Sequence, residues 1–165
     1  MQTVRADKAN FSLREKVDFA FIMMGSFVFK NNDELLRHLD CVSNSLNSGG
    51  LYLIENLCLD WTRIWSIPQR WTSERNGIKI ETTYKPELRD LLAQTYEEKI
   101  TLEVDDNGKK SSLLETHVLK YVFPQEFMSI VKLSDQFEFI GWFERSRLKK
   151  LKEAKSDNIT ILRKK

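Results

Sequence analysis

Two short segments end in residues that could contact a ligand. The apolar run 17–24 leads into a glycine and a serine, and the apolar segment 51–56 ends in Glu55 and Asn56. Open α/β sheets bind ligands at the carboxyl ends of their strands, so both segment ends are candidate sites. The alternatives are a plain strand end with core methionines and an ordinary polar strand terminus. The candidates at the first end are Met23, Met24, Gly25 and Ser26.

Aromatic side chains and a histidine from the middle of the chain form a second set of candidates. These are Trp61, Trp65, Trp71, Tyr84, His117 and Tyr121. Aromatic faces hold flat or cationic substrates well, and an imidazole can serve as a general base. The alternatives are the hydrophobic core of a lid and a structural strand histidine. His38, which we expect on the exposed side of a helix, receives no role.

The first candidate site requires a strand, a helix and a second strand to position it. The run 17–24 is nearly all apolar and stops at a turn signal, as in a parallel strand covered on both faces. A helix with a capping asparagine begins near 31–34, carries a buried leucine and valine stripe, and closes at the glycines 49–50. With the strand 51–56, these elements predict a right-handed βαβ unit with parallel strands.

The middle of the chain changes to alternating polar and apolar residues. This pattern, with a strong hairpin turn at 105–108, predicts a three-stranded antiparallel insert over 78–123. Pro124 then begins a helix. We expect a strand at 137–143, a charged and partly helical linker at 144–157, and a last short strand at 158–163.

Bulk composition is that of an ordinary globular domain. The 165 residues are 41% hydrophobic and 30% charged, with a net charge of +2. Cys41 and Cys58 lack the spacing of a metal-binding pair, and we expect reduced thiols and no metal site. We predict a cytoplasmic protein without a signal peptide or a membrane-spanning segment. The basic carboxyl-terminal region is expected to be solvated, with salt-dependent RNA binding as a weaker alternative.

Taken in order, these segments resemble the class I S-adenosylmethionine-dependent methyltransferases. That family has a (F/V)D-x-(I/V) strand, a helix ending in L-x-P-G-G and a strand ending in an acid; the counterparts are 17–21 and 46–55, with Ser48 replacing the proline. Residues 124–127 match a P-x-E-(L/F) helix start that precedes an aromatic strand and a final antiparallel strand. The resemblance implies an α/β fold, namely a partial Rossmann-like methyltransferase sheet. It also implies a single partial domain over 1–165, with 61–123 as a lid or substrate insert.

The resemblance further implies a function and a cofactor. It predicts methyl transfer from S-adenosylmethionine to a small-molecule acceptor, with the segment 23–26 beside the methionine part of the cofactor. The family's glycine-rich turn has no counterpart, because the six glycines, at 25, 49, 50, 77, 108 and 141, form no G-x-G. The acid that grips the ribose is also missing. We therefore expect a truncated chain that is inactive alone; the alternative is a non-catalytic binding or assembly module derived from a methyltransferase.

The missing part has a consequence for association. In the complete family fold, the strand at 17–24 pairs with the strand that carries the glycine-rich turn. Without that neighbour, its backbone N–H and C=O groups form an open edge. We expect self-association, or pairing with a complementing chain, through this edge.

Overall fold

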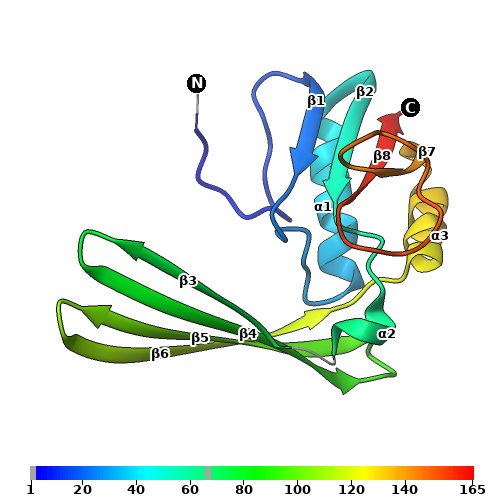
Figure 1. The fold of residues 1–165 in the computed structure, drawn as a ribbon. Coiled ribbons are helices and arrows are strands. Elements are labelled where there is room, and N and C mark those ends of the chain that lie inside the picture. Colours follow the sequence, from blue (N-terminus) through cyan, green and yellow to red (C-terminus); the bar gives the residue numbers. More distant parts are fainter. Residues whose placement is uncertain (1–2, 66–67) are drawn as a thin grey trace. The chain divides into compact units, whose positions relative to one another are not determined.

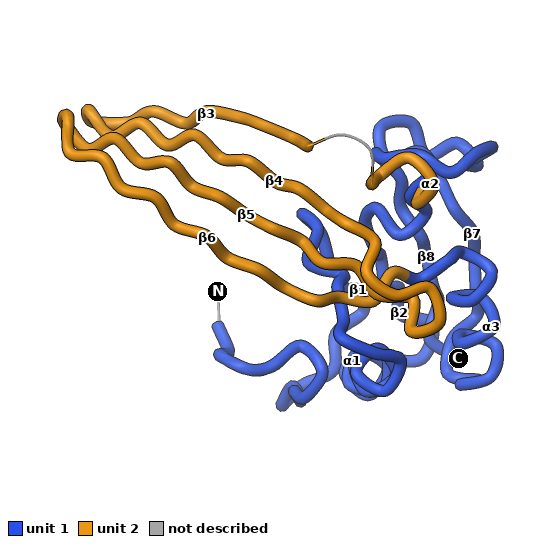
Figure 2. The backbone as a smooth tube through the Cα atoms, turned by 90° about the horizontal axis from the view of Figure 1, so that it is seen from below, with its two compact units in different colours: residues 1–60, 122–165 blue, residues 61–121 orange. Residues whose placement is uncertain are grey.

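The computed structural model describes residues 3–65 and 68–165 (Figure 1). These residues divide into two compact units, residues 1–60 with 122–165 (unit 1) and residues 61–121 (unit 2), as Figure 2 shows. The elements follow in the order β1 (Val17–Ile22), α1 (Asn32–Ser45), β2 (Leu46–Glu55), α2 (Trp61–Ile64), β3 (Gln69–Arg75), β4 (Ile78–Asp90), β5 (Thr95–Asp106), β6 (Lys109–Lys120), α3 (Pro124–Ser134), β7 (Phe137–Glu144) and β8 (Asn158–Lys164).

Unit 1 contains a four-stranded sheet in the order β1-β2-β8-β7. β1 and β2 are parallel, as the βαβ pattern predicted, whereas β8 runs antiparallel to both β2 and β7. α1 and α3 contribute to one continuous core with the sheet, which includes Leu39, Ile54, Phe127 and Leu162. All four of these side chains are 0% exposed. No helix among the described residues has the length and apolar character to cross a lipid bilayer.

The start of α1 follows from its sequence, but its end does not. The Asn31 side chain accepts a hydrogen bond from the Glu34 N–H at 2.9 Å, which is the predicted amino-terminal cap. The helix ends at Ser45, and β2 begins immediately at Leu46. The glycines that were expected to close the helix therefore lie within β2. Gly50 is needed there because a Cβ atom would lie 2.9 Å from the Asn47 carbonyl oxygen.

β1 differs from its predicted environment. β1 is an edge strand, which agrees with the expected open edge. The predicted cover on both faces is wrong, because Phe19 and Phe21 are 51% and 62% exposed. Ala20 and Ile22, on the other face, pack against the core. The continuous apolar run reflects two apolar faces, of which the described residues of unit 1 bury one.

Unit 2 is an antiparallel sheet in the order β3-β4-β5-β6. It has four strands rather than the expected three, because β3 pairs with β4 from Gln69 to Arg75. β3 was missed because its sequence is polar and all seven of its residues are exposed. Both Asn-Gly turns, at 76–77 and 107–108, have positive φ angles at both residues, as such hairpins require.

The charged linker is the remaining difference. Residues 144–157 were expected to be partly helical, but they form turns and an isolated bridge between Phe143 and Lys150. The Arg145 N–H donates to the Asp157 carbonyl oxygen at 2.9 Å, so this segment closes on itself between β7 and β8.

Candidate functional site

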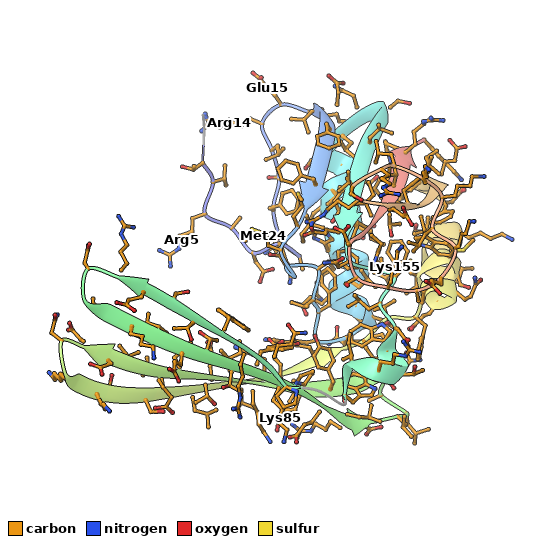
Figure 3. The ribbon with its side chains drawn as sticks, in the orientation of Figure 1. Arg5, Arg14, Glu15, Met24, Lys85 and Lys155 are labelled. Atoms are coloured by element: carbon orange, nitrogen blue, oxygen red, sulfur yellow. The ribbon has the colours of Figure 1, made fainter. Side chains whose placement is uncertain are left out.

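A tight turn occupies the carboxyl end of β1. The Ser26 N–H donates to the Met23 carbonyl oxygen at 3.2 Å, and Met24 and Gly25 between them have φ angles of 58° and 72°. A methionine in this left-handed region is uncommon and requires support from its surroundings. Met24 is the second residue after β1, and its side chain is 92% exposed (Figure 3).

Glu55 supplies part of that support. Its side chain is 3% exposed, and its Oε2 accepts a hydrogen bond from the Met24 N–H at 2.5 Å. Its Oε1 forms an ion pair with Arg145 Nη1, and Arg145 Nε in turn donates to Asp157 Oδ1 at 2.6 Å. A buried carboxylate needs such partners to offset its lost hydration. Glu55 therefore positions the turn, and both of its oxygens are engaged within unit 1.

Asn56 is also engaged within unit 1. Its φ angle is 56°, and its N–H donates to the Asn158 carbonyl oxygen at 2.9 Å. Its side-chain oxygen accepts from the Asp157 N–H at 2.9 Å and the Asn158 N–H at 3.3 Å. Both Glu55 and Asn56 thus contact the segment that joins β7 to β8.

An open hollow of about 320 Å³ lies next to the turn, on the face of the sheet that carries Phe19 and Phe21. Its lining is apolar apart from one guanidinium group. The residues are Phe19, Phe21, Met23, Leu53, Arg145, Leu148 and Ile159. Of the predicted segment 23–26, Met23 faces this hollow. The arrangement can hold an apolar group, with a cation at its border.

A partly buried polar network holds the same turn from another direction. Lys8 Nζ donates to the Ser26 carbonyl oxygen at 3.0 Å and also to that of Val28. The Lys8 carbonyl oxygen lies 2.8 Å from His38 Nδ1, and His38 Nε2 lies 2.6 Å from the Tyr52 hydroxyl oxygen. Burial lowers the pKa of His38 and raises the pKa of Tyr52 well above its usual value. Both groups are thus held neutral at pH 7.

The placement of His38 corrects the sequence analysis. We expected it on the exposed side of its helix, but it is 3% exposed. Its spacing could have revealed this, because His38 lies three residues after Leu35 and four before Val42, both of which are buried in the core. Arg145 was also missed as a site residue, since nothing in the local sequence links it to a residue 90 positions earlier.

In unit 2, Trp61 and Trp65 pack with two tyrosines. The rings of Trp61 and Trp65 stack with centroids 5.5 Å apart, and each lies 5.6 Å from both Tyr96 and Tyr121. The tyrosines are 3% exposed, while the tryptophans are half-buried. This close packing favours a lid core, in which both tryptophans are half-buried.

The remaining candidates lie elsewhere in the sheet. Trp71 is 49% exposed in β3, opposite Thr82. His117 lies in β6, with its Nε2 2.9 Å from Glu115 Oε1. Tyr84 is half-buried in β4, and burial raises its pKa. The structure thus brings Trp61, Trp65 and Tyr121 together, and Tyr84 adjoins them through a hydrogen bond with Tyr96. Trp71 and His117 lie at separate positions.

The fold resembles solved methyltransferases. DesVI from Streptomyces venezuelae matches with a TM-score of 0.76 at 14% identity, over 96% of this chain and 63% of its own. KedS8, a sugar N-methyltransferase from Streptoalloteichus sp., matches with 0.74 at 14%, over 97% and 61%. CalS10 from Micromonospora echinaspora, an amino pentose methyltransferase solved with S-adenosylmethionine, matches with 0.73 at 12%, over 97% and 63%.

The chain has a class I methyltransferase fold. The predicted order of strand, helix and parallel strand, followed by a separate antiparallel sheet and a final antiparallel strand, is confirmed in this fold. The chain spans about 63% of the length of the solved chains that it matches. No protein-family model matches the sequence, and a comparison with curated proteins finds no match.

Proposed function

We propose that this chain is part of an S-adenosylmethionine-dependent methyltransferase that acts on a small molecule, with an amino sugar as the first candidate acceptor. The observation that carries the proposal is the fold likeness to DesVI over 96% of the chain. KedS8 and CalS10, which match over 97% of the chain, are described as a sugar N-methyltransferase and an amino pentose methyltransferase. A cytoplasmic location stays a prediction.

The turn at 23–26 is the proposed contribution to cofactor binding. Bound S-adenosylmethionine would supply an activated methyl group, and this chain would contact its methionine part. The apolar, polarisable Met23 at the hollow suits that part, and Glu55 and Lys8 fix the backbone on either side of Gly25. Because the sequence contains no G-x-G, we propose that the chain alone binds the cofactor weakly and transfers no methyl group.

Trp61 and Trp65, which are half-buried in unit 2, are the proposed contacts for the acceptor. A protonated amino sugar offers both a cation and apolar ring faces, and tryptophan attracts both. Trp71, His117 and Tyr121 remain further candidates. Methyl transfer to an amine depends mainly on positioning, so the proposal assigns no general base.

Methyl NMR of the full chain tests the cofactor proposal. Methionine methyl groups labelled with ¹³C report separately on Met23, Met24 and Met128 during a titration with S-adenosylhomocysteine. We expect weak, saturable shifts at Met23 and Met24, while Met128 in α3 stays unchanged. Equal shifts at all three methyl groups, or none at millimolar ligand, would contradict the proposed site.

A pair of glycine variants sharpens the test. Gly25 and Gly49 have φ angles of 72° and 81°, and a Cβ atom would meet nothing within 4 Å at either position. Gly25→Ala and Gly49→Ala should therefore strain the backbone similarly, by about 1 kcal/mol. Only Gly25→Ala should weaken the response of Met23 and Met24. If both variants weaken it equally, the effect is one of stability and not of the turn.

The exposed side of β1 supports the second candidate function, a binding or assembly module. Among the residues that the structure describes, β1 pairs with β2 alone, and its exposed phenylalanines offer an apolar surface beside the open edge. We propose that this edge accepts a strand from a complementing chain or from a second copy. In hydrogen exchange, β1 amides should become slower with rising protein concentration if copies pair there. Unchanged exchange would leave only the complementing chain.

A further inference from the structure

Two Asn-Gly pairs each form a two-residue hairpin turn in unit 2. Asn76-Gly77 joins β3 to β4, and Asn107-Gly108 joins β5 to β6. All four residues are exposed, and the asparagines have φ angles of 53° and 50°. An asparagine side chain reacts readily with the backbone when glycine follows, because glycine has no Cβ atom to keep its amide nitrogen away. The two turns share this local sequence, so their surroundings decide which of them reacts.

The turn at 107–108 holds both of its reacting groups. The Gly108 N–H donates to Asp105 Oδ1 at 2.8 Å. The side-chain amide of Asn107 donates to Asp106 Oδ1 at 2.9 Å. Hydrogen bonds to carboxylates are among the stronger ones in proteins, and both must break before the Gly108 nitrogen can approach the Asn107 side chain. The two carboxylates also oppose deprotonation of the Gly108 amide, because the anion would lie beside like charges.

The turn at 76–77 holds neither of its reacting groups. Among the described residues, no hydrogen bond engages the Asn76 side chain or the Gly77 N–H. The Gly77 carbonyl oxygen accepts from the Asn107 N–H at 3.2 Å, but this contact leaves the Gly77 nitrogen available. The strand that precedes the turn, β3, is exposed at all seven residues, so this hairpin is the one expected to open locally more often.

We propose that Asn76 is a site of spontaneous deamidation, through which the β3–β4 turn acquires a backbone isoaspartate. The Gly77 nitrogen gives up its proton to hydroxide and bonds to the side-chain carbonyl carbon of Asn76, and the side-chain nitrogen leaves as ammonia. Water then opens the succinimide ring. Opening at the backbone carbonyl gives isoaspartate, and opening at the former side-chain carbonyl gives aspartate. The sum of these steps consumes one water, releases one ammonia and involves no oxidation or reduction.

Isoaspartate at this position should loosen β3. It lengthens the backbone by a methylene group within a turn that closes directly between Arg75 and Ile78, and it adds a negative charge. Turn length fixes the register of a hairpin, so all seven pairs between β3 and β4 depend on this turn. Because every residue of β3 is exposed, burial adds little to hold the strand once its register is lost. The modification is independent of methyl transfer.

Mass spectrometry of the aged chain tests the proposal. The full chain is incubated at mildly alkaline pH in water enriched in ¹⁸O, which labels each carboxyl group formed by ring opening. Trypsin cuts after Arg75 and Lys79, so the peptide with Asn76 is separate from the peptide with Asn107. Deamidation at Asn76 should be at least about tenfold faster than at Asn107, the factor expected for one charged hydrogen bond that must break. Isoaspartate should be the main product.

Two variants separate the effect of structure from that of sequence. Asp105→Ala frees the Gly108 N–H and should accelerate deamidation at Asn107 without changing the rate at Asn76. Asn76→Gly keeps a residue that tolerates positive φ but cannot deamidate. Hydrogen exchange in β3 should become faster as the wild type ages and stay constant in Asn76→Gly. Circular dichroism verifies that both variants are folded.

Unfolding the chain in urea removes the contrast between the turns, so the two asparagines should then react at similar rates. Equal rates in the folded chain would overturn the proposal, as would a preference for Asn76 that persists unchanged in urea. So would a folded chain in which Asn76 stays intact while the chain in urea is converted. Unchanged exchange in β3 after conversion of Asn76 would overturn the predicted loosening.

Discussion

The two units contain sheets of equal strand number but bury their side chains in different ways. In unit 1, α1 and α3 pack on one face of the sheet, and every described side chain with 0% exposure belongs to this unit. In unit 2 the lowest exposure among described residues is 3%, at Tyr96 and Tyr121. Strand pairing alone is thus enough to form a sheet, whereas helices packed on one face exclude water from it. Unit 2 therefore depends on strand pairing more than on a core.

Equivalent leucine truncations should show this difference most strongly. Leu39→Ala in the core of unit 1 should lower the free energy of unfolding by about 3–5 kcal/mol, because it leaves a cavity. Leu102→Ala in half-buried β5 should cost only about 1 kcal/mol. Urea unfolding monitored by circular dichroism and tryptophan fluorescence measures both. Equal losses would mean that unit 2 has a core of its own.

His38 tests whether the buried network of unit 1 is as important as its apolar core. His38→Ala should cost roughly 2–3 kcal/mol, because the Tyr52 hydroxyl loses its partner in a buried site. Burial lowers the pKa of His38, so below its ordinary value of 6.5 the unfolded chain gains a proton that the folded chain resists. Stability should therefore fall as the pH drops from neutral to the folded pKa.

A substitution tests this assignment. The pH dependence should become weaker in His38→Ala, which removes the buried imidazole. An unchanged slope would assign the pH dependence to other groups.

Glu55 should have a smaller effect on stability but a local effect on the candidate site. Glu55→Ala should cost about 1–2 kcal/mol, because the Met24 N–H and Arg145 lose a shared buried acceptor. Amide exchange in the turn 23–26 should accelerate. Glu138→Ala, which removes a pair on the surface of the same unit with side chains about half exposed, should change stability by at most about 0.5 kcal/mol. Comparable losses of stability in the two variants would mean that Glu55 contributes no more than a surface ion pair.

The charged pairs of Glu87 in unit 2 should give the smallest effect. Hydrogen bonds and charge from Lys85 and Lys99 lower the pKa of Glu87 to about 2. A lowered folded pKa gives stability that is present above the unfolded value of 4.5 and is lost as the pH falls towards 2. This loss should diminish in high salt, which screens exposed pairs. Glu87→Gln should remove the salt sensitivity while the sheet stays folded.

Local sequence patterns predicted where helices and turns lie better than they predicted which faces of these elements are buried. Asn31 marked the start of a helix, Pro124 began another, and the Asn-Gly pair at 107–108 marked a hairpin turn. Each of these signals acts within four residues, so it survives in any tertiary context. β3 was not predicted because edge strands need no apolar alternation. The exposed face of β1 was not predicted because a continuous apolar run does not indicate which face of the strand is buried.

The candidate site could be predicted from the sequence only in part, for the same reason. The turn at 23–26 could be predicted from the end of an apolar run. Its support by Glu55 and Arg145 could not, because these residues meet only after β2 and β8 have paired. Long-range contacts of this kind depend on topology, which periodicity does not encode.

The packing of Trp61 against Tyr121 has a consequence for the order of folding. These are the first and last residues of unit 2, and their rings lie 5.6 Å apart. Unit 2 pairs strands that are neighbours along the chain, whereas β2 must find β8 across more than one hundred residues, as in the pairing of Glu55 with Ile159. A unit 2 that zips up first would hold its ends together and shorten the loop that unit 1 has to close. Unit 2 would then hold the two parts of unit 1 close together during folding. Weakening the contact of Trp61 with Tyr121 should slow the folding of unit 1 without changing its core.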